Sequence, residues 1–201
     1  MPVSISSAFD AGAIEVVRAE VAHEIDLRLR ADSHADFSQW FYFRVHGVQG
    51  QRCRLRFLNA GQATYPDGWK DYQAVASYDR EHWFRVPTSF DGEVLTIAHT
   101  PRHDSIYYAY FEPYSWERHL GLLARAQLSP LARLVHLGCT ADGRDLDMVT
   151  VSAAVGESVA TRRQIWVIAR QHPGETMAEW FAEGVLEALL GSSQKTEKIV
   201  R

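Results

Sequence analysis

The sequence predicts an α+β fold, in which an N-terminal antiparallel β-sandwich is followed by the start of an α/β/α domain. Two observations support this. Apolar residues recur with period two up to about residue 114 and with helical periodicity directly after it. A short apolar run near residue 165 then leads straight into another helical pattern, which is typical of a covered strand in an α/β sheet. We therefore expect two domains, 1–114 and 115–201.

Strand patterns fill the first domain. Polar and apolar residues alternate in 24–30 and again in 52–57, where three arginines share the outer face, so both are interpreted as half-solvated antiparallel strands. Further strands are expected at 40–45, 73–78, 83–86, 94–97 and 105–111. Turn-forming pairs such as Asp91-Gly92 separate these strands. A series of short strands of this kind predicts a β-sandwich.

The longest loop of this domain connects the strand that ends near residue 58 to the one that starts near 73, and it contains Trp69. We expect Trp69 to pin the loop to the core, because large aromatic side chains are mostly buried. An exposed Trp69 beside Lys70 would instead be a ligand platform. Cys53 and Cys139 are far apart, and we expect both to be free, buried thiols.

The second domain begins with a helix that Ser115 can cap and that ends before Pro130. Segments 134–138 and 146–151 flank a turn at 141–144 and predict a hairpin. Ile165 to Ala169 form a β-branched run that predicts a strand covered on both faces.

A second helix is expected from Met177 to Leu190. Thr176 and Glu179 have the spacing of a capping box, and Gly191 follows the last apolar residue. The apolar residues that recur at helical spacing are Met177, Trp180, Phe181, Val185 and Leu189.

Between this strand and this helix lies the candidate site. His172 and Glu175 are both zinc-ligand types, and the Pro173-Gly174 pair between them can make a tight turn that aims both side chains at one point. Glu175 also precedes a helix, whose N-terminal dipole favours the ionised carboxylate that a metal needs.

The spacing of this pair is a weak signal by itself. His23 and Asp26 have the same spacing inside an alternating strand, where residues three apart face opposite sides and cannot converge on one ion. We expect the remaining histidines to lie on the surface or in turns: His34, His46, His82, His99, His103, His119 and His136.

Composition excludes several function classes. The net charge is −4 with acids and bases interspersed, and no basic stripe that would bind nucleic acid is visible. No run of about 18 apolar residues and no signal-peptide pattern is present, so we expect no membrane span and a cytoplasmic location.

The residues from Gln171 to Thr176, QHPGET, closely resemble the zinc-binding segment of the metallocarboxypeptidases, specifically the cytosolic carboxypeptidase subfamily. Segments 37–43, 55–59 and 107–114 and the helix after Ser115 are similar to the β-sandwich domain that precedes the catalytic domain in that subfamily. The resemblance covers most of the chain. It implies a zinc peptidase that acts on the C-termini of peptides or proteins, with acidic C-terminal residues, Glu or Asp, as the expected substrates.

In the family, two histidines and a glutamate hold one Zn²⁺ that activates water, a distant glutamate is the general base, and an arginine binds the terminal carboxylate. Only His172 and Glu175 can be transferred to this chain as metal ligands. The resemblance implies that the general base and the other groups lie beyond Arg201, so no catalytic residue is expected within the chain.

The end of the chain fits this expectation. Residues 198–201 look like the start of an uncompleted strand, and the second domain has too few elements to cover a parallel sheet. We expect the catalytic domain to be incomplete and the chain alone to be inactive.

The alternative is a non-catalytic β-sandwich that binds a protein partner, with a purely structural His172 loop. We interpret Arg162, Arg163 and Arg170 as solvated or ion-paired rather than substrate-binding.

Overall fold

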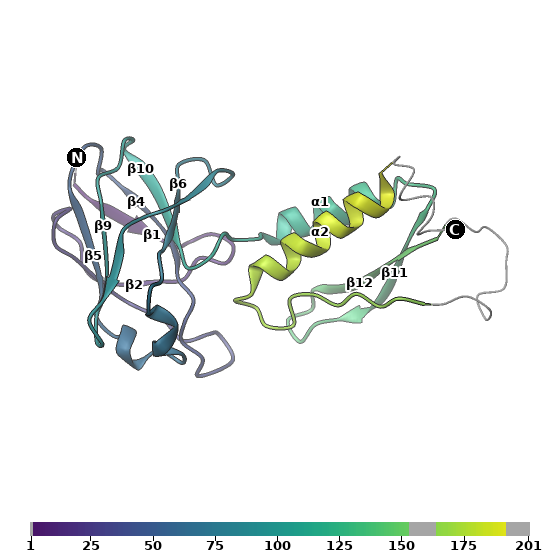
Figure 1. The fold of residues 1–201 in the computed structure, drawn as a ribbon, viewed down its shortest axis with the longest axis horizontal. Coiled ribbons are helices and arrows are strands. Elements are labelled where there is room, and N and C mark those ends of the chain that lie inside the picture. Colours follow the sequence, from purple (N-terminus) through teal and green to yellow (C-terminus); the bar gives the residue numbers. More distant parts are fainter. Residues whose placement is uncertain (1, 153–163, 192–201) are drawn as a thin grey trace. The chain divides into compact units, whose positions relative to one another are not determined.

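The computed structural model describes residues 2–152 and 164–191. The chain divides into two compact units, Met1–Pro113 and Tyr114–Arg201, which are drawn in Figure 1 and considered separately below.

The first unit is a β-sandwich of two five-stranded sheets. One sheet has the strand order β1-β4-β10-β6-β7, with β1 (Ser4–Ser6), β4 (Tyr42–His46), β10 (Ser105–Ala109), β6 (Val75–Ser77) and β7 (Trp83–Arg85). The other has the order β2-β3-β5-β9-β8, with β2 (Glu15–Arg18), β3 (Ile25–Arg28), β5 (Cys53–Phe57), β9 (Leu95–His99) and β8 (Thr88–Phe90). The strands predicted for this domain are all present, whereas β1, β2 and β8, each only three or four residues long, are not among the predictions.

The core lies between the two sheets. In β4, Phe43 and Val45 are fully buried while Arg44 between them is exposed, as period-two alternation requires. Phe41 contacts Phe57 of the opposite sheet, with ring centroids 4.6 Å apart. Aromatic side chains thus fill much of the space between the sheets.

One pairing in the second sheet differs from the prediction. Strands β3 and β5 are parallel, with Asp26 beside Arg56, so the two alternating segments are not antiparallel. Arg56 is also less exposed than a solvated arginine, because it donates to the buried Asp26 carboxylate at 2.7 Å. Arg18 donates to the other oxygen of Asp26 at 2.9 Å. The paired charges explain how an aspartate is tolerated inside this strand.

The long loop is pinned as predicted. Its two 3₁₀ turns are η1 (Ala60–Gln62) and η2 (Pro66–Trp69). Trp69 is buried, and its indole N–H donates to the carbonyl oxygen of Ala60 at 3.0 Å. Cys53 is buried as expected, but Cys139 is exposed, because it lies on an open hairpin.

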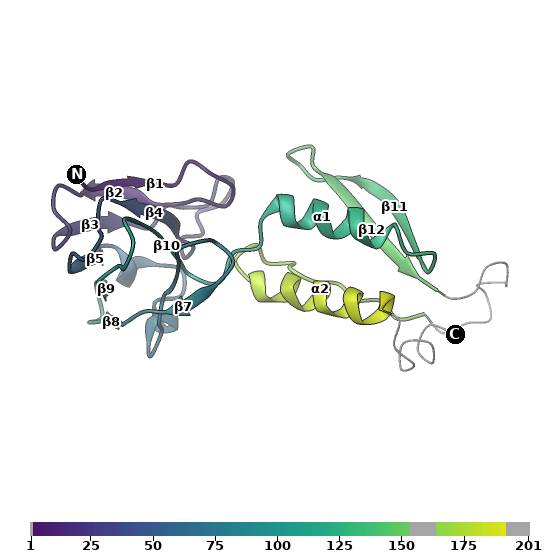
Figure 2. The ribbon, with the colours of Figure 1, turned by 90° about the horizontal axis from the view of Figure 1, so that it is seen from above.

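The second unit contains two helices and one hairpin. The elements are α1 (Trp116–Ala126), β11 (Ala132–Cys139), β12 (Asp145–Val151) and α2 (Thr176–Leu190). The two helices run side by side, and the hairpin forms a separate two-stranded sheet (Figure 2). Ser115 caps α1 as predicted, since its hydroxyl accepts from the Arg118 N–H at 3.2 Å. Among the described residues, no helix has both the length and the apolar character that a membrane crossing requires.

The predicted strand at 165–169 is wrong for this structure. These residues are not assigned to a strand, and the side chains of Ile165 and Trp166 are 84% and 70% exposed. The residues have the composition of a buried strand, but a strand also needs a neighbour, and among the described residues of this unit only β11 and β12 pair. The expected strand at 198–201 lies outside the described residues.

The capping box at α2 is also wrong. Glu175 is the N-cap residue and makes no side-chain cap, while Thr176 is already helical. The Glu179 carboxylate instead contacts the side chains of His119 and Arg170. The predicted apolar stripe is partly exposed, with Met177 and Phe181 open to solvent, whereas the buried residues of α2 are Thr176 and Glu183.

Candidate metal centre

The structure brings His172 and Glu175 together. The Glu175 N–H donates to the His172 carbonyl oxygen at 3.0 Å, which closes the predicted turn over Pro173 and Gly174. The His172 Nδ1 lies 3.1 Å from the Glu175 Oε1. Both side chains are largely exposed, at 78% and 55%. The turn therefore presents a nitrogen and an oxygen donor to solvent at the N-terminus of α2.

Arg170 stabilises this turn through hydrogen bonds to two backbone carbonyl groups. Its guanidinium donates to the Pro173 carbonyl oxygen at 3.1 Å and to the Tyr114 carbonyl oxygen at 3.0 Å. Its backbone has a φ of 56°, a left-handed conformation that costs a non-glycine residue about 1–2 kcal/mol. These contacts hold the chain in that conformation. Arg170 is therefore ion-paired, as expected, and it also stabilises the turn. Arg162 and Arg163 lie outside the described residues.

Glu179 anchors Arg170. One of its carboxylate oxygens accepts from Arg170, and the other lies 2.8 Å from the His119 Nδ1. The His119 ring stacks on Trp116, with centroids 5.0 Å apart and planes 19° from parallel. A chain of contacts thus connects α1 to the turn that carries His172.

A second ionic contact joins the two helices further along. The Glu183 carboxylate is buried and accepts two hydrogen bonds from Arg118, both at 2.8 Å. Arg125 donates to the same carboxylate at 3.3 Å. The Arg118 guanidinium lies 4.0 Å from the centroid of the Trp180 ring, a cation–π contact. This bidentate pair fixes α2, and with it the N-terminal end of α2, against α1.

Both glutamates stay ionised because of these partners. Burial by itself would raise the pKa of Glu179, but the hydrogen bonds from His119 and Arg170 outweigh it and hold the pKa below its ordinary value. Burial acts in the same direction on Glu183, and Arg118 again outweighs it, so that pKa is also lowered.

The remaining histidines only partly follow the expectation. His82 is exposed in a turn with Asp79, at 2.7 Å, whereas His99 is partly buried and lies 3.0 Å from the Tyr108 hydroxyl. His119 is the residue that the sequence missed, because its partner Glu179 is 60 residues away and no local pattern connects them. Asp26 does not form a metal site with His23, because its carboxylate accepts hydrogen bonds from Arg18 and Arg56.

The donor set of the His172 turn fits zinc. Donor atoms around a tetrahedral Zn²⁺ lie about 3.3 Å apart, since zinc–nitrogen and zinc–oxygen bonds are about 2.0–2.1 Å long. The 3.1 Å between the His172 Nδ1 and the Glu175 Oε1 is close to that spacing. Imidazole nitrogen and carboxylate oxygen are both ordinary zinc ligands.

Two family descriptions match the chain. The cytosolic carboxypeptidase N-terminal domain matches residues 5–111, and the zinc carboxypeptidase domain matches residues 121–201, which include the His172 turn. An uncharacterized protein of Zymomonas mobilis is 44% identical over 201 residues, and cytosolic carboxypeptidase 1 of Xenopus laevis is 27% identical over 241 residues.

Solved structures give the same result. The metallo-carboxypeptidase of Burkholderia cenocepacia is 49% identical with a TM-score of 0.94, and the match covers 100% of this chain and 54% of that one. The metallo-carboxypeptidase of Pseudomonas aeruginosa, solved in complex with (2-guanidinoethylmercapto)succinic acid, is 39% identical with a TM-score of 0.89 and covers 97% of this chain and 51% of that one.

The match covers 100% of this chain but 51% of the Zymomonas relative, and 98% of this chain but 19% of the Xenopus relative. From a sandwich domain and a following segment that each match one part of the family in the expected order, we conclude that the chain belongs to the cytosolic carboxypeptidase family of zinc carboxypeptidases.

Proposed function

We propose that this chain is the N-terminal part of a zinc-dependent metallocarboxypeptidase that removes C-terminal residues from peptides or proteins. The observation that carries the proposal is the 3.1 Å approach of the His172 Nδ1 to the Glu175 Oε1 on an anchored turn. This turn lies within the segment that matches the zinc carboxypeptidase domain.

In this proposal His172 and Glu175 are two of the ligands of Zn²⁺. When bound, the zinc supplies Lewis acidity, which polarises a scissile carbonyl and lowers the pKa of a water. The work of this chain is to hold the two donors: the turn sets their separation, and Arg170 ties that turn to Glu179 and to the Tyr114 carbonyl. We propose residues 115–201 as the first part of a catalytic domain, because the chain covers 51% of the Zymomonas relative and 54% of the Burkholderia cenocepacia structure, and we expect the chain alone to be inactive.

The proposal extends to the substrate class. The compound bound to the Pseudomonas relative carries a guanidino group as well as two carboxylates, so it does not distinguish acidic from basic C-terminal side chains, and the substrate class rests on the resemblance to the cytosolic carboxypeptidases. We therefore include peptides that end in Glu or Asp as the preferred substrates. The cytosolic names of the relatives support a cytoplasmic location.

The test uses a protein in which this chain is continued by the remaining catalytic sequence of the Burkholderia cenocepacia relative, since the two are 49% identical over the shared part. Release of the C-terminal residue is measured on peptides that end in Glu, Asp or Leu, together with bound zinc.

His172→Ala and Glu175→Gln are each expected to lower activity at least about a hundredfold and to lower zinc content, since even outer-shell partners of a metal cost 10–100-fold. His23→Ala, on an exposed histidine with the same spacing to an acid, is the matched control and should change neither. Unchanged activity and zinc content in His172→Ala would contradict the proposed ligand role, whereas no activity and no bound zinc in the unsubstituted protein would favour the binding-module interpretation.

A further inference from the structure

An irregularity in the β11–β12 hairpin places metal-ligand types on one face. His136 pairs with Asp147, and Cys139 pairs with Asp145, although His136 and Cys139 are three positions apart and the two aspartates are two apart. The difference is absorbed by a β-bulge between His136 and Gly138, which leaves Leu137 as the extra residue.

Gly138 within the bulge has a φ of 146°, a conformation that L side chains rarely adopt. Without the bulge, residues three apart on a strand would face opposite sides. With it, the side chains of His136 and Cys139 lie on the same face of the ladder as Asp145 and Asp147.

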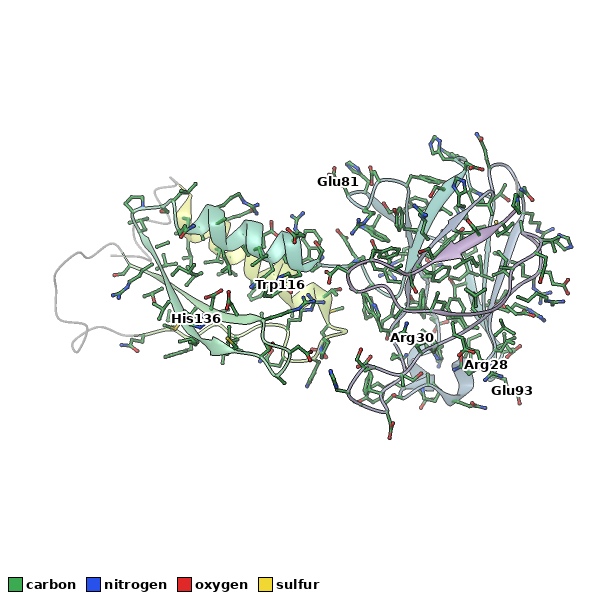
Figure 3. The ribbon with its side chains drawn as sticks, turned by 180° about the vertical axis from the view of Figure 1, so that it is seen from behind. Arg28, Arg30, Glu81, Glu93, Trp116 and His136 are labelled. Atoms are coloured by element: carbon green, nitrogen blue, oxygen red, sulfur yellow. The ribbon has the colours of Figure 1, made fainter. Side chains whose placement is uncertain are left out.

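The donor atoms are close enough to share one ion. The ligand atoms of His136, Cys139 and Asp145 all lie within 4.8 Å of one another, and all three residues are exposed. The His136 Nδ1 is 3.6 Å from the Asp147 Oδ1 and 4.0 Å from the Asp145 Oδ1. Figure 3 shows the position of His136 on this hairpin.

We propose that this hairpin binds Zn²⁺ through the His136 imidazole, the Cys139 thiolate and the Asp145 carboxylate, with a water in the fourth position. Donor atoms around tetrahedral zinc lie about 3.3–3.6 Å apart, given zinc–sulfur bonds of about 2.3 Å and zinc–nitrogen bonds of about 2.0 Å. The donor atoms of His136, Cys139 and Asp145 lie within 4.8 Å of one another, and these exposed side chains can change rotamer to close the remaining distance.

The choice of metal follows from the donors. One thiolate, one imidazole and carboxylate oxygens form a mixed set that suits a borderline ion such as Zn²⁺, whereas Mg²⁺ and Ca²⁺ require oxygen ligands throughout. On binding, the Cys139 thiol releases its proton to water, and the imidazole coordinates in its neutral form.

The role of the ion would be structural. It crosslinks β11 to β12 in a two-stranded sheet, and an isolated hairpin is only marginally stable in water. An ion that binds the folded state and not the unfolded state raises the stability of the unit in proportion to the logarithm of its concentration. The inference is independent of the proposed function, because it involves neither His172 nor Glu175.

The test uses Co²⁺ as a spectroscopic substitute for Zn²⁺ on the 201-residue chain. We expect the sulfur-to-cobalt charge-transfer absorption of a thiolate ligand in the near ultraviolet, and we expect it equally in His172→Ala, which lacks the histidine of the other candidate site. Competition with Zn²⁺ should abolish the band and give the zinc affinity.

Cys139→Ser should remove the band, while Cys53→Ala, the matched change at the buried cysteine, should keep it. His136→Ala and Asp145→Asn should each weaken zinc binding at least about tenfold, the smallest loss typical even of an outer-shell partner. Circular dichroism checks that each variant is folded.

Three results would overturn the proposal: no thiolate band in the wild-type chain, a band that survives Cys139→Ser, or unchanged zinc affinity in both His136→Ala and Asp145→Asn. Failure of zinc binding at His172 would leave these readouts unchanged, so the two proposals fail separately.

Discussion

The guanidinium of Arg170 donates to the carboxylate of Glu179 and so ties the segment before the His172 turn to α2. The same guanidinium also donates to the Pro173 carbonyl oxygen, inside the turn, and Glu179 is in turn held by His119. The geometry of the candidate zinc ligands therefore depends on α1, about 50 residues earlier in the chain.

Replacing Arg170 by Ala should loosen this turn. Loss of a charged hydrogen-bonding partner costs about 1.5–3 kcal/mol, so the unfolding free energy of the second unit should fall by about that amount. The Glu175 amide, which closes the turn, should exchange its hydrogen at least about tenfold faster. Hydrogen exchange followed by mass spectrometry or NMR measures both.

Arg133→Ala is the matched control, since Arg133 is an exposed arginine of the same unit, on β11. It should leave the exchange of the Glu175 amide unchanged. Equal protection of that amide in the wild type and in Arg170→Ala would show that the turn does not need Arg170.

Glu183→Gln should be the most damaging exchange of a single carboxylate for an amide on α2. It leaves Arg118 and Arg125 facing a neutral group in a buried position, and we expect a loss of about 1.5–3 kcal/mol in the unfolding free energy. Glu187→Gln, one turn later and exposed, should change it by less than about 0.5 kcal/mol. Urea unfolding of both variants separates them, and equal midpoints would contradict the assignment.

Acid should destabilise the second unit through the same carboxylates. The pKa values of Glu179 and Glu183 are lower in the folded chain than the ordinary value of 4.5. Their contribution to stability is therefore fully present above about pH 4.5 and is lost as the pH falls through that value towards the folded pKa values.

Thermal unfolding between pH 6 and pH 3 (about the range in which glutamates titrate) should show this loss. The double variant Glu179→Gln, Glu183→Gln should be less stable at neutral pH and less sensitive to acid. A pH dependence as steep in the double variant as in the wild type would assign acid sensitivity to other groups.

The two cysteines should differ sharply in reactivity. Burial raises the pKa of the Cys53 thiol to about 11, and its side chain is enclosed in the sandwich core, while Cys139 is exposed. A thiol reagent applied to the native, chelator-treated chain should modify Cys139 fast and Cys53 only after denaturation. Cys139→Ser should then show no fast phase, and a fast phase that persists would mean that Cys53 is accessible.

The sequence predicts this fold where the information is local. Alternation identifies strands such as β4 and β5, and the Ser115 cap and the turn between His172 and Glu175 depend on residues a few positions apart. The failures involve contacts between distant segments. Alternation cannot show that β3 lies parallel to β5. A capping-box spacing cannot show that the Glu179 carboxylate contacts His119 instead of capping its own helix.

The same division applies to the sites. The His172–Glu175 pair is visible in the sequence because one turn contains both residues. The His136 cluster is hidden, because a bulge places residues three apart on one face and the second strand supplies the aspartates.

Segment 165–168, which belongs to no helix or strand in the described structure, favours association between copies of this chain. It presents four consecutive large apolar side chains, each more than half exposed. An exposed apolar segment rich in β-branched residues is a template on which another chain can add as a strand, which is the first step of edge-to-edge aggregation. Concentration-dependent association of the 201-residue chain should therefore begin at this segment, and a charged residue in place of Val167 should delay it.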